Sequence, residues 1–372
     1  MASQQEIFQE VLKMVSFETH ELGIDLSDGD NISALTEQAE RSGVASWIFY
    51  RLLQKSENVL KYPELMASLK RRYLAVLFDN QQKLRLYRHI EKILVAHDIP
   101  SALLKGMAMA FTVYPEEALR PMGDLDILVP EQLVIKARDI LLDSGAQSVH
   151  IPMSEWHERN NAHVRAMRLP PYKHMVEVHS KLYATGSRLL PKKMLWEDSV
   201  VMRTTSFGKF PVLKEPLMLY HLGSHLSYGY SMGGIRLGWL VDIAMLLDAA
   251  EDINALMGEL LKINPSYNNE LLRAVGWAVP FLYADKRRQL EPWQKSFVNF
   301  PANSDFLEEQ DAEPRHRQIV LENLWHTPGL INKVKGTWFQ IFPSPEYMAH
   351  YHGLKRKIML PAAYLKRLIG RG

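Results

Sequence analysis

The stretch LRPMGDLDILVP, residues 119–130, carries two carboxylates one residue apart at the start of an apolar run. The run predicts a strand, and alternate side chains of a strand share a face, so Asp124 and Asp126 are expected to point the same way. Two like charges side by side repel each other, whereas a bound metal ion would reverse that repulsion. A third acid, Glu177, lies in the alternating segment MVEVHSKL, which predicts a second strand.

Three carboxylates on neighbouring strands are suited to magnesium, which prefers oxygen ligands together with substrate phosphates and water. They suit two Mg²⁺ (or Mn²⁺) ions about 3.5–4 Å apart, the arrangement of two-metal phosphoryl chemistry. One ion would activate an attacking hydroxyl, and the other would stabilise charge at the α-phosphorus of a nucleoside triphosphate (NTP). We therefore predict Asp124, Asp126 and Glu177 as catalytic metal ligands, although Glu177 could instead pair with Lys173 or Lys181.

Basic and glycine residues upstream of the acids are candidates for phosphate binding. In LLKGMAMA, a short predicted strand leads through Lys105 and Gly106 into a helix. A glycine at such a turn lets the backbone approach a phosphate, and the helix N-terminus offers free N–H donors. Lys105 could meet the phosphate as a cation, and Arg120 is a second candidate. A Lys-Gly pair alone could equally be a solvated turn, so the order of all these elements along the chain carries the prediction.

Three histidines are candidates for the acceptor site. His179 shares a strand face with Glu177, so it could support a metal ligand or line an acceptor pocket. His221 and His225 are four residues apart and therefore share a helix face. They could be core residues, acceptor-site residues or two zinc ligands, but a zincin would have a Glu where Leu222 stands.

A helix predicted from Gly234 carries Arg236, Trp239 and Asp242 at a spacing of three. We expect Trp239 in the core. Arg236 and Asp242 could form an internal salt bridge. Alternatively, Arg236 contacts the triphosphate, and Asp242 orients the acceptor or acts as a base.

From Leu103 to His179 the chain resembles nucleotidyltransferases of the DNA polymerase beta type. More narrowly, LLKGMAMAFTVYPEEALRPMGDLDILV followed by VEVHSKL is similar to an uncharacterised bacterial family, nucleotidyltransferase family 5. The features that carry this resemblance are Lys105-Gly106, Tyr114-Pro115, Arg120, Gly123-Asp124, Asp126, Glu177 and His179. The later segment LYHLGSHLSYGYSMGGIRLGWLVDIAMLL resembles the family's helical segment, with its paired His and its Arg-x-x-Trp-x-x-Asp run.

The resemblance implies metal ligation by Asp124, Asp126 and Glu177, and NTP contact near Gly106. There is one departure from the wider superfamily. Its glycine turn usually carries Gly-Ser, whose hydroxyl and amides hold the phosphates, whereas Gly106 is followed by Met107. Because the narrower family is uncharacterised, the resemblance implies no acceptor.

The elements that must position these residues predict a mostly helical α+β fold with a small mixed-sheet palm. Residues 1–97 are expected to form a helical N-terminal domain, residues 98–213 the nucleotidyltransferase-like palm, and residues 214–372 a helical C-terminal domain with a basic tail. A long amphipathic helix is predicted from Glu64 to Ala96. Asn80 lies on its apolar stripe, where we expect a core polar residue bonded to a neighbour.

Composition excludes several classes of site. The chain has no Cys, so a disulfide framework, a zinc-thiolate site and a cysteine nucleophile are excluded. We predict a cytoplasmic protein, because the N-terminus lacks the apolar region of a secretory signal and no window is apolar enough to span a membrane. A net charge of +2 does not favour nucleic acid as a partner. The tail from Lys355 to Gly372 is basic, either as a solvated helix end or as a contact for RNA, a membrane or an anionic ligand.

The sequence therefore predicts a Mg²⁺-dependent nucleotidyltransferase. It would move an NMP group from an NTP to a hydroxyl, amine or phosphate of an unidentified small-molecule or macromolecular acceptor and release pyrophosphate. One alternative is a non-catalytic module that keeps the palm for nucleotide binding or protein interaction. Another is a zinc hydrolase that uses His179, His221 and His225.

Overall fold

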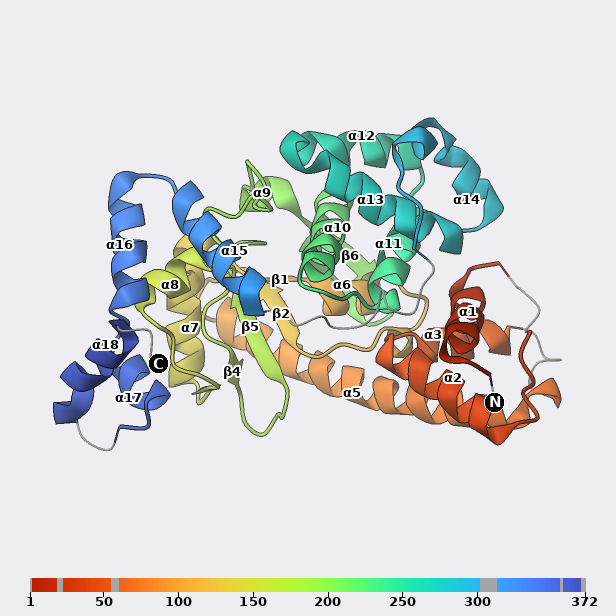
Figure 1. The fold of residues 1–372 in the computed structure, drawn as a ribbon, viewed down its shortest axis with the longest axis horizontal. Coiled ribbons are helices and arrows are strands. Elements are labelled where there is room, and N and C mark those ends of the chain that lie inside the picture. Colours follow the sequence, from red (N-terminus) through yellow and green to blue (C-terminus); the bar gives the residue numbers. More distant parts are fainter. Residues whose placement is uncertain (1, 19–22, 55–59, 302–312, 355–356, 369–372) are drawn as a thin grey trace. The chain divides into compact units, whose positions relative to one another are not determined.

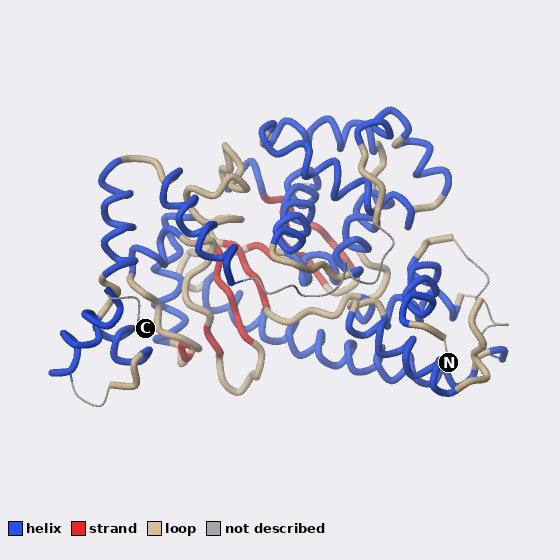
Figure 2. Tube along the Cα trace, viewed as in Figure 1, coloured by secondary structure: helices blue, strands red, loops and turns tan. Residues whose placement is uncertain are grey.

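A computed structural model describes residues 2–18, 23–54, 60–301, 313–354 and 357–368 of the 372-residue chain. These residues contain more helix than strand, and the strands all lie between residues 102 and 213 (Figure 2). The seven described strands form one mixed sheet. This confirms the predicted fold class, a mostly helical α+β protein with a small mixed sheet.

The colours of Figure 1 follow the helices and strands along the chain, from red at the N-terminus to blue at the C-terminus. The α-helices are α1 (Gln4–Val15), α2 (Gly29–Arg41), α3 (Ala45–Leu53), α5 (Pro63–Val95), α6 (Lys105–Thr112), α7 (Val134–Asp143), α8 (Glu155–Asn160), α9 (Trp196–Ser199), α10 (Glu215–Ser231), α11 (Leu237–Ala249), α12 (Ile253–Ile263), α13 (Asn268–Ala278), α14 (Ala284–Gln289), α15 (Glu313–His326), α16 (Leu330–Ile341), α17 (Pro345–Tyr351) and α18 (Leu360–Leu368). The strands are β1 (Ala102–Leu103), β2 (Leu125–Leu128), β3 (Gln147–Ser148), β4 (Met167–Arg168), β5 (Met175–His179), β6 (Val200–Thr205) and β7 (Gly208–Leu213).

The strand order in the sheet is β3-β4-β5-β2-β1-β7-β6. The pairs β2–β5 and β1–β7 are parallel, whereas β3–β4, β4–β5 and β6–β7 are antiparallel. Strands β2 and β5 are rich in buried Leu, Ile and Val. This composition is expected of parallel strands, because both faces of a parallel sheet are usually covered by other parts of the protein. The β6–β7 hairpin was not predicted from the sequence. Strand β6 reads VVMRTT, in which apolar and polar residues do not alternate, and none of its residues is fully buried.

The chain forms two compact units, each built from three separate segments. Unit 1 comprises residues 1–84, 103–122 and 192–313, and unit 2 comprises residues 85–102, 123–191 and 314–372. The predicted division into domains at residues 1–97, 98–213 and 214–372 follows chain order and remains a prediction.

Unit 1 holds a helical cluster in which α10 packs against α11, α12 and α13 (Figure 1). Its interior includes Tyr220 and Trp277, both almost fully buried. Helix α10 begins with Glu215 and Pro216 at its first two positions, where the missing N–H of proline has no cost. The helix expected to carry His221 and His225 corresponds to α10, and the helix expected from Gly234 corresponds to α11, which begins at Leu237.

Helix α5, the long helix coloured orange in Figure 1, fixes the chain segment that leads into β2. The buried amide of Asn80 donates hydrogen bonds to the carbonyls of Glu117 (2.6 Å) and Arg120 (2.9 Å). One turn further along, the buried ammonium of Lys83 donates to the Met122 carbonyl at 2.9 Å and pairs with Asp79. The prediction that Asn80 is a core residue bonded to a neighbour is confirmed.

Within the described residues, no helix is long and apolar enough to cross a membrane. Of the basic tail, Lys355, Arg356 and Arg371 lie outside the described residues.

Replacing Asn80 with Leu should lower the free energy of unfolding by about 2–4 kcal/mol, because one buried and one partly buried carbonyl would lose their donor. Urea denaturation would measure the change. The exposed neighbour Gln81, replaced by Leu on the same helix, is the control and should change stability by no more than about 0.5 kcal/mol. Equal stabilities of the two variants would contradict this role of Asn80.

Candidate metal centre

Two carboxylates of unit 2 are neighbours because β2 and β5 pair in parallel. The register places Asp126 directly opposite Glu177, with Leu125 opposite Val176 and Ile127 opposite Val178. Both flanking apolar pairs are buried, and this fixes the register, since a slip by one residue would turn the apolar side chains to the other face. Asp126 and Glu177 therefore project from the same face of the sheet. The Asp126 residue is only 8% exposed.

The imidazole of His179 lies between the two carboxylates. Its Nε2 atom is 2.9 Å from Oδ1 of Asp126 and 3.5 Å from Oε2 of Glu177. His179 is two residues after Glu177 on β5, so the alternation of the strand brings both side chains to one face, as the sequence predicted. The first distance is that of a hydrogen bond, which orients the carboxylate of Asp126.

A second histidine, His163, was not singled out in the sequence. Its backbone forms an isolated antiparallel bridge with His179, and the two rings lie 5.1 Å apart. Its Nε2 atom is 3.7 Å from Oε2 of Glu177. His163 lies in an isolated bridge outside the named helices and strands, so no regular apolar pattern in the sequence pointed to it.

Charge and burial act in opposite directions on Glu177. Burial raises the pKa of this carboxyl, but the hydrogen bond with His179 and the nearby His163 together hold the pKa below its usual value, despite repulsion from Asp126. The carboxylate form of Glu177 is therefore favoured inside the fold. An ionised Glu177 beside the carboxyl group of Asp126 is a suitable place for a cation.

Asp126, Glu177 and His179 each offer an atom that could hold a metal ion, and these atoms all lie within 4.8 Å of one another. Two carboxylate oxygens and one imidazole nitrogen make a mixed oxygen and nitrogen donor set. The oxygens suit Mg²⁺ or Mn²⁺, whereas imidazole is a weaker partner for Mg²⁺ than for transition metals. The donor set thus fits a divalent cation on the carboxylates, with His179 as a ligand or as their hydrogen-bond partner.

Asp124 differs from its partner in the predicted pair. It immediately precedes β2, in a bend, and is half-buried. It is not among the three residues whose ligand atoms converge within 4.8 Å. Its role as a metal ligand remains a prediction.

In unit 1, Asp242 of α11 is fully buried and forms an ion pair with Arg120. The Nε atom of Arg120 lies 2.7 and 2.9 Å from the two carboxylate oxygens. The hydroxyl of Tyr114 donates to the same carboxylate at 2.9 Å, and burial followed by the charge of Asp242 raises the pKa of Tyr114 well above its usual value. Of the two alternatives for Arg236 and Asp242, the internal salt bridge between them is wrong in its partner, because Asp242 pairs with Arg120.

Arg236 is exposed and caps α11 instead of lying on it, since the helix begins at Leu237 and not at Gly234. Lys105 opens α6 with a positive φ of 45° and is half-buried. Gly106 is buried, and a Cβ at this position would lie 2.9 Å from Cβ of Met122. Close packing on Met122 is therefore a reason for glycine at residue 106 that does not involve a phosphate.

The paired histidines of α10 also belong to unit 1. His221 is buried, and the His225 ring lies 4.6 Å from the ring of Trp239 and 6.5 Å from that of His221. Trp239 is half-buried, not fully enclosed as a core residue would be. Among the described residues, the potential metal-ligand group contains His179 but neither of these histidines. The zinc hydrolase alternative gains no support from this arrangement.

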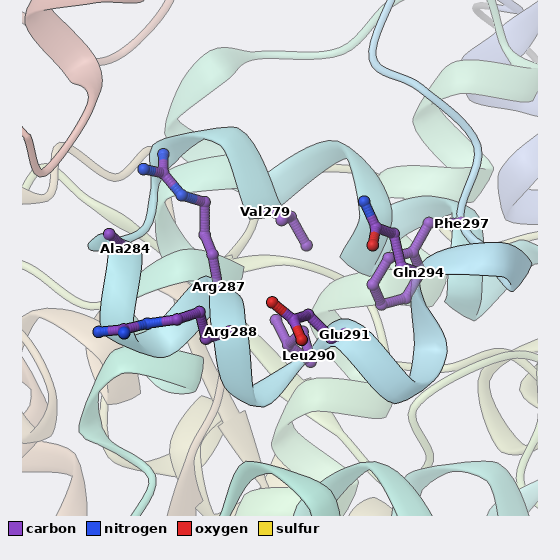
Figure 3. Close-up of a pocket in the computed structure, with 8 residues that line it drawn as sticks. All are labelled: Val279, Ala284, Arg287, Arg288, Leu290, Glu291, Gln294 and Phe297. Carbon is purple, nitrogen blue, oxygen red and sulfur yellow. The ribbon is translucent and has the colours of Figure 1, made fainter.

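A pocket of about 660 Å³ lies elsewhere in unit 1 (Figure 3). It is lined by Val279, Ala284, Arg287, Arg288, Leu290, Glu291, Gln294 and Phe297. None of the residues predicted for the site lines it, and the guanidinium of Arg287 pairs with Glu18 at 2.7 Å. We therefore place the candidate site at the carboxylates of β2 and β5, where the groups suited to metal chemistry converge.

Comparison with known proteins identifies a family. Residues 28–264 match the family described as "uncharacterised nucleotidyltransferase". No curated protein matches the chain significantly. A solved structure, an antigenic nucleotidyltransferase-like protein from Paracoccidioides brasiliensis, is 12% identical, with a TM-score of 0.28, over 51% of this chain and 91% of its own.

Replacing Asp242 with Asn should cost about 3–5 kcal/mol of folding stability, because it would leave the charge of Arg120 without its buried partner. Chemical denaturation would measure the loss, and the exposed acid Glu251, replaced by Gln, is the control. A double-mutant cycle with Arg120→Met should show strong coupling between the two residues. Full stability of the Asp242→Asn variant would contradict a structural role for the pair.

Proposed function

The chain belongs to the family of uncharacterised nucleotidyltransferases, whose match covers 237 of its residues (28–264), and on that premise we propose a metal-dependent transfer reaction. In this proposal an NMP group passes from an NTP to a hydroxyl, amine or phosphate of an acceptor, and pyrophosphate is released. The observation that supports it most is the convergence of Asp126 and Glu177 on one face of the parallel pair β2–β5.

The carboxylates of Asp126 and Glu177 would hold Mg²⁺, or Mn²⁺ in its place. A bound ion of this kind supplies positive charge that polarises a phosphoryl oxygen and lowers the pKa of a bound nucleophile. The hydrogen bond from His179 keeps the Asp126 carboxylate in one orientation, and partners of this kind commonly change metal affinity by about 10–100-fold. His163 adds a second imidazole next to Glu177.

The number of ions is part of the proposal. Two ions require oxygen ligands beyond the two converging carboxylates, and Asp124 and the triphosphate of the substrate are the proposed sources. Asp124 is half-buried and lies directly before β2, two residues from Asp126 along the chain.

Phosphate contacts by Lys105, Gly106 and Arg236 also remain proposals. Arg236 is exposed, which suits a contact with a ligand phosphate, and Lys105 is half-buried at the first position of α6. For Arg120 we propose a structural role in place of phosphate binding, since its Nε atom is committed to Asp242. Acceptor-site roles for His179, His221, His225 and Asp242 remain predictions, as do the cytoplasmic location and the identity of the NTP.

Replacing Asp126 with Asn should abolish Mg²⁺-dependent pyrophosphate release and weaken NTP binding by at least roughly tenfold, because one of the two converging carboxylates is lost. Calorimetry with each NTP in the presence of Mg²⁺ would measure binding, and release of pyrophosphate with candidate acceptors would measure turnover. Glu177→Gln should behave in the same way. The exposed acid Glu155 of unit 2, replaced by Gln, is the control and should leave both properties unchanged.

The results separate the proposal from its alternative. Unchanged NTP binding in both Asp126→Asn and Glu177→Gln would contradict the proposed site. Tight binding that depends on the two acids, without pyrophosphate release for any acceptor, would favour the non-catalytic nucleotide-binding module.

Replacing His179 with Ala should weaken Mn²⁺ binding by about 10–100-fold, because Asp126 would lose its orienting hydrogen bond. Titration of Mn²⁺ followed by electron paramagnetic resonance would measure affinity without any substrate. A His179→Gln variant, which keeps a hydrogen-bond donor, should recover part of the affinity. Unaltered affinity in the Ala variant would exclude this role of His179.

A further inference from the structure

Helix α16 of unit 2 carries a row of exposed apolar side chains. Leu330 is 77% exposed and Ile331 is 71% exposed, and Val334, Trp338 and Ile341 continue the row. At about 100° per residue, these five positions fall within an arc of about 100° on one side of the helix. An arc of this width is the apolar stripe of an amphipathic helix, which proteins ordinarily bury.

The opposite side of α16 is the side that packs on the protein. Gly336 is buried, and a Cβ at this position would lie 2.5 Å from both Leu324 and the ring of Trp156 on α8. Position 336 lies about 180° around the helix from the middle of the exposed arc. The close packing at Gly336 therefore directs the apolar arc away from the interior of unit 2.

Two lysines border the apolar arc on its two sides. Lys333 lies about 60° before Leu330 around the helix, and Lys335 lies about 40° beyond Ile331. The ammonium of Lys333 also sits 5.3 Å from the ring centroid of Trp325, an exposed residue of α15. Apolar residues with tryptophan, flanked by lysines on both sides, are typical of a helix that lies in the surface of an anionic membrane.

The sequence around α16 is strongly basic. Between residues 326 and 372, Glu346 is the one acid, against the basic residues Lys333, Lys335, Lys355, Arg356, Lys357, Lys366, Arg367 and Arg371. The rest of the chain is close to neutral or acidic, since the whole chain carries only +2. The positive charge is therefore concentrated in the part of the sequence that contains the exposed apolar arc.

Helix α18 continues these properties. Its Leu365 is 60% exposed and is followed by the exposed Lys366. Arg367 of the same helix donates to the carbonyl of Gln340 at 3.0 Å, which ties α18 to the last turn of α16. Unit 2 thus presents exposed apolar and basic side chains on two helices that are joined to each other.

We propose that α16 docks unit 2 on an anionic lipid surface, with its apolar arc in the interface and Lys333 and Lys335 against lipid head groups. The helix would lie in the membrane plane, because its twelve residues are fewer than the roughly 20 that a membrane-spanning helix needs. No helix in the described part of the chain is long and apolar enough to span a membrane. Charge decides among the occupants. Two copies of this face would bring four lysines together, and a nucleic acid would leave the Leu, Ile and Val side chains uncovered.

The proposal is independent of the transfer reaction, and vesicle binding by the full chain tests it. The chain should sediment with vesicles of phosphatidylcholine and phosphatidylglycerol, but far less with phosphatidylcholine alone, and added NaCl should release it. Removal of the apolar contacts by Ile331→Ser with Trp338→Ser should lower partitioning at least about tenfold. Removal of the charges by Lys333→Gln with Lys335→Gln should also lower it about tenfold and reduce the preference for anionic vesicles.

The control is Phe78→Ser, a substitution of a 67% exposed aromatic residue on α5 in unit 1, which should leave partitioning unchanged. Ile331, Trp338, Lys335 and Phe78 are exposed and Lys333 is half-buried, so circular dichroism should show intact folding. Failure of the full chain to bind anionic vesicles, or equal binding by the α16 variants, would overturn the proposal. A third outcome would also overturn it: the full chain self-associates in analytical ultracentrifugation, does not bind vesicles, and loses self-association on Ile331→Ser with Trp338→Ser. The apolar arc would then contact a second copy of the chain.

Discussion

The parallel pairing of β2 with β5 is the constraint on which the candidate site depends. It sets Asp126 opposite Glu177 on one face, and the buried Leu, Ile and Val pairs on either side hold that register. Two carboxylates so placed repel each other, and the fold offsets the repulsion with imidazoles from His179 and His163. The fold keeps Glu177 ionised in a partly buried place, which favours a divalent cation there.

A second buried charge pair, Arg120 with Asp242, serves a different purpose. It joins the segment before β2 to α11 within unit 1, together with the hydroxyl of Tyr114. The amide of Asn80 and the ammonium of Lys83 hold the same segment from α5. Since a buried pair is costly to break, this network stabilises the path of the chain into β2.

Much of the fold could be predicted from the sequence, because apolar residues recur at regular spacings within the helices and strands and glycine or proline marks many of their ends. The apolar spacing gave α5 its extent within one residue at each end, and the alternation of MVEVHSKL identified β5. The site was harder. His163 was missed because its role comes from a backbone bridge to His179, a contact between segments that no local pattern encodes. Arg236 was assigned to the helix α11, but α11 begins at Leu237, the residue after Arg236. The pairing of Asp242 with Arg120 was also missed, because residue spacing along one helix gives no information on a partner outside that helix.

The most direct test of the account is the location of a metal ion. A crystal of the protein soaked with Mn²⁺ and an NTP should give an anomalous peak at about 2.0–2.2 Å from carboxylate oxygens of both Asp126 and Glu177. The triphosphate should lie beside it. A protein that binds NTP with no Mn²⁺ between these two carboxylates, or with the ion at another site, would contradict the central claim.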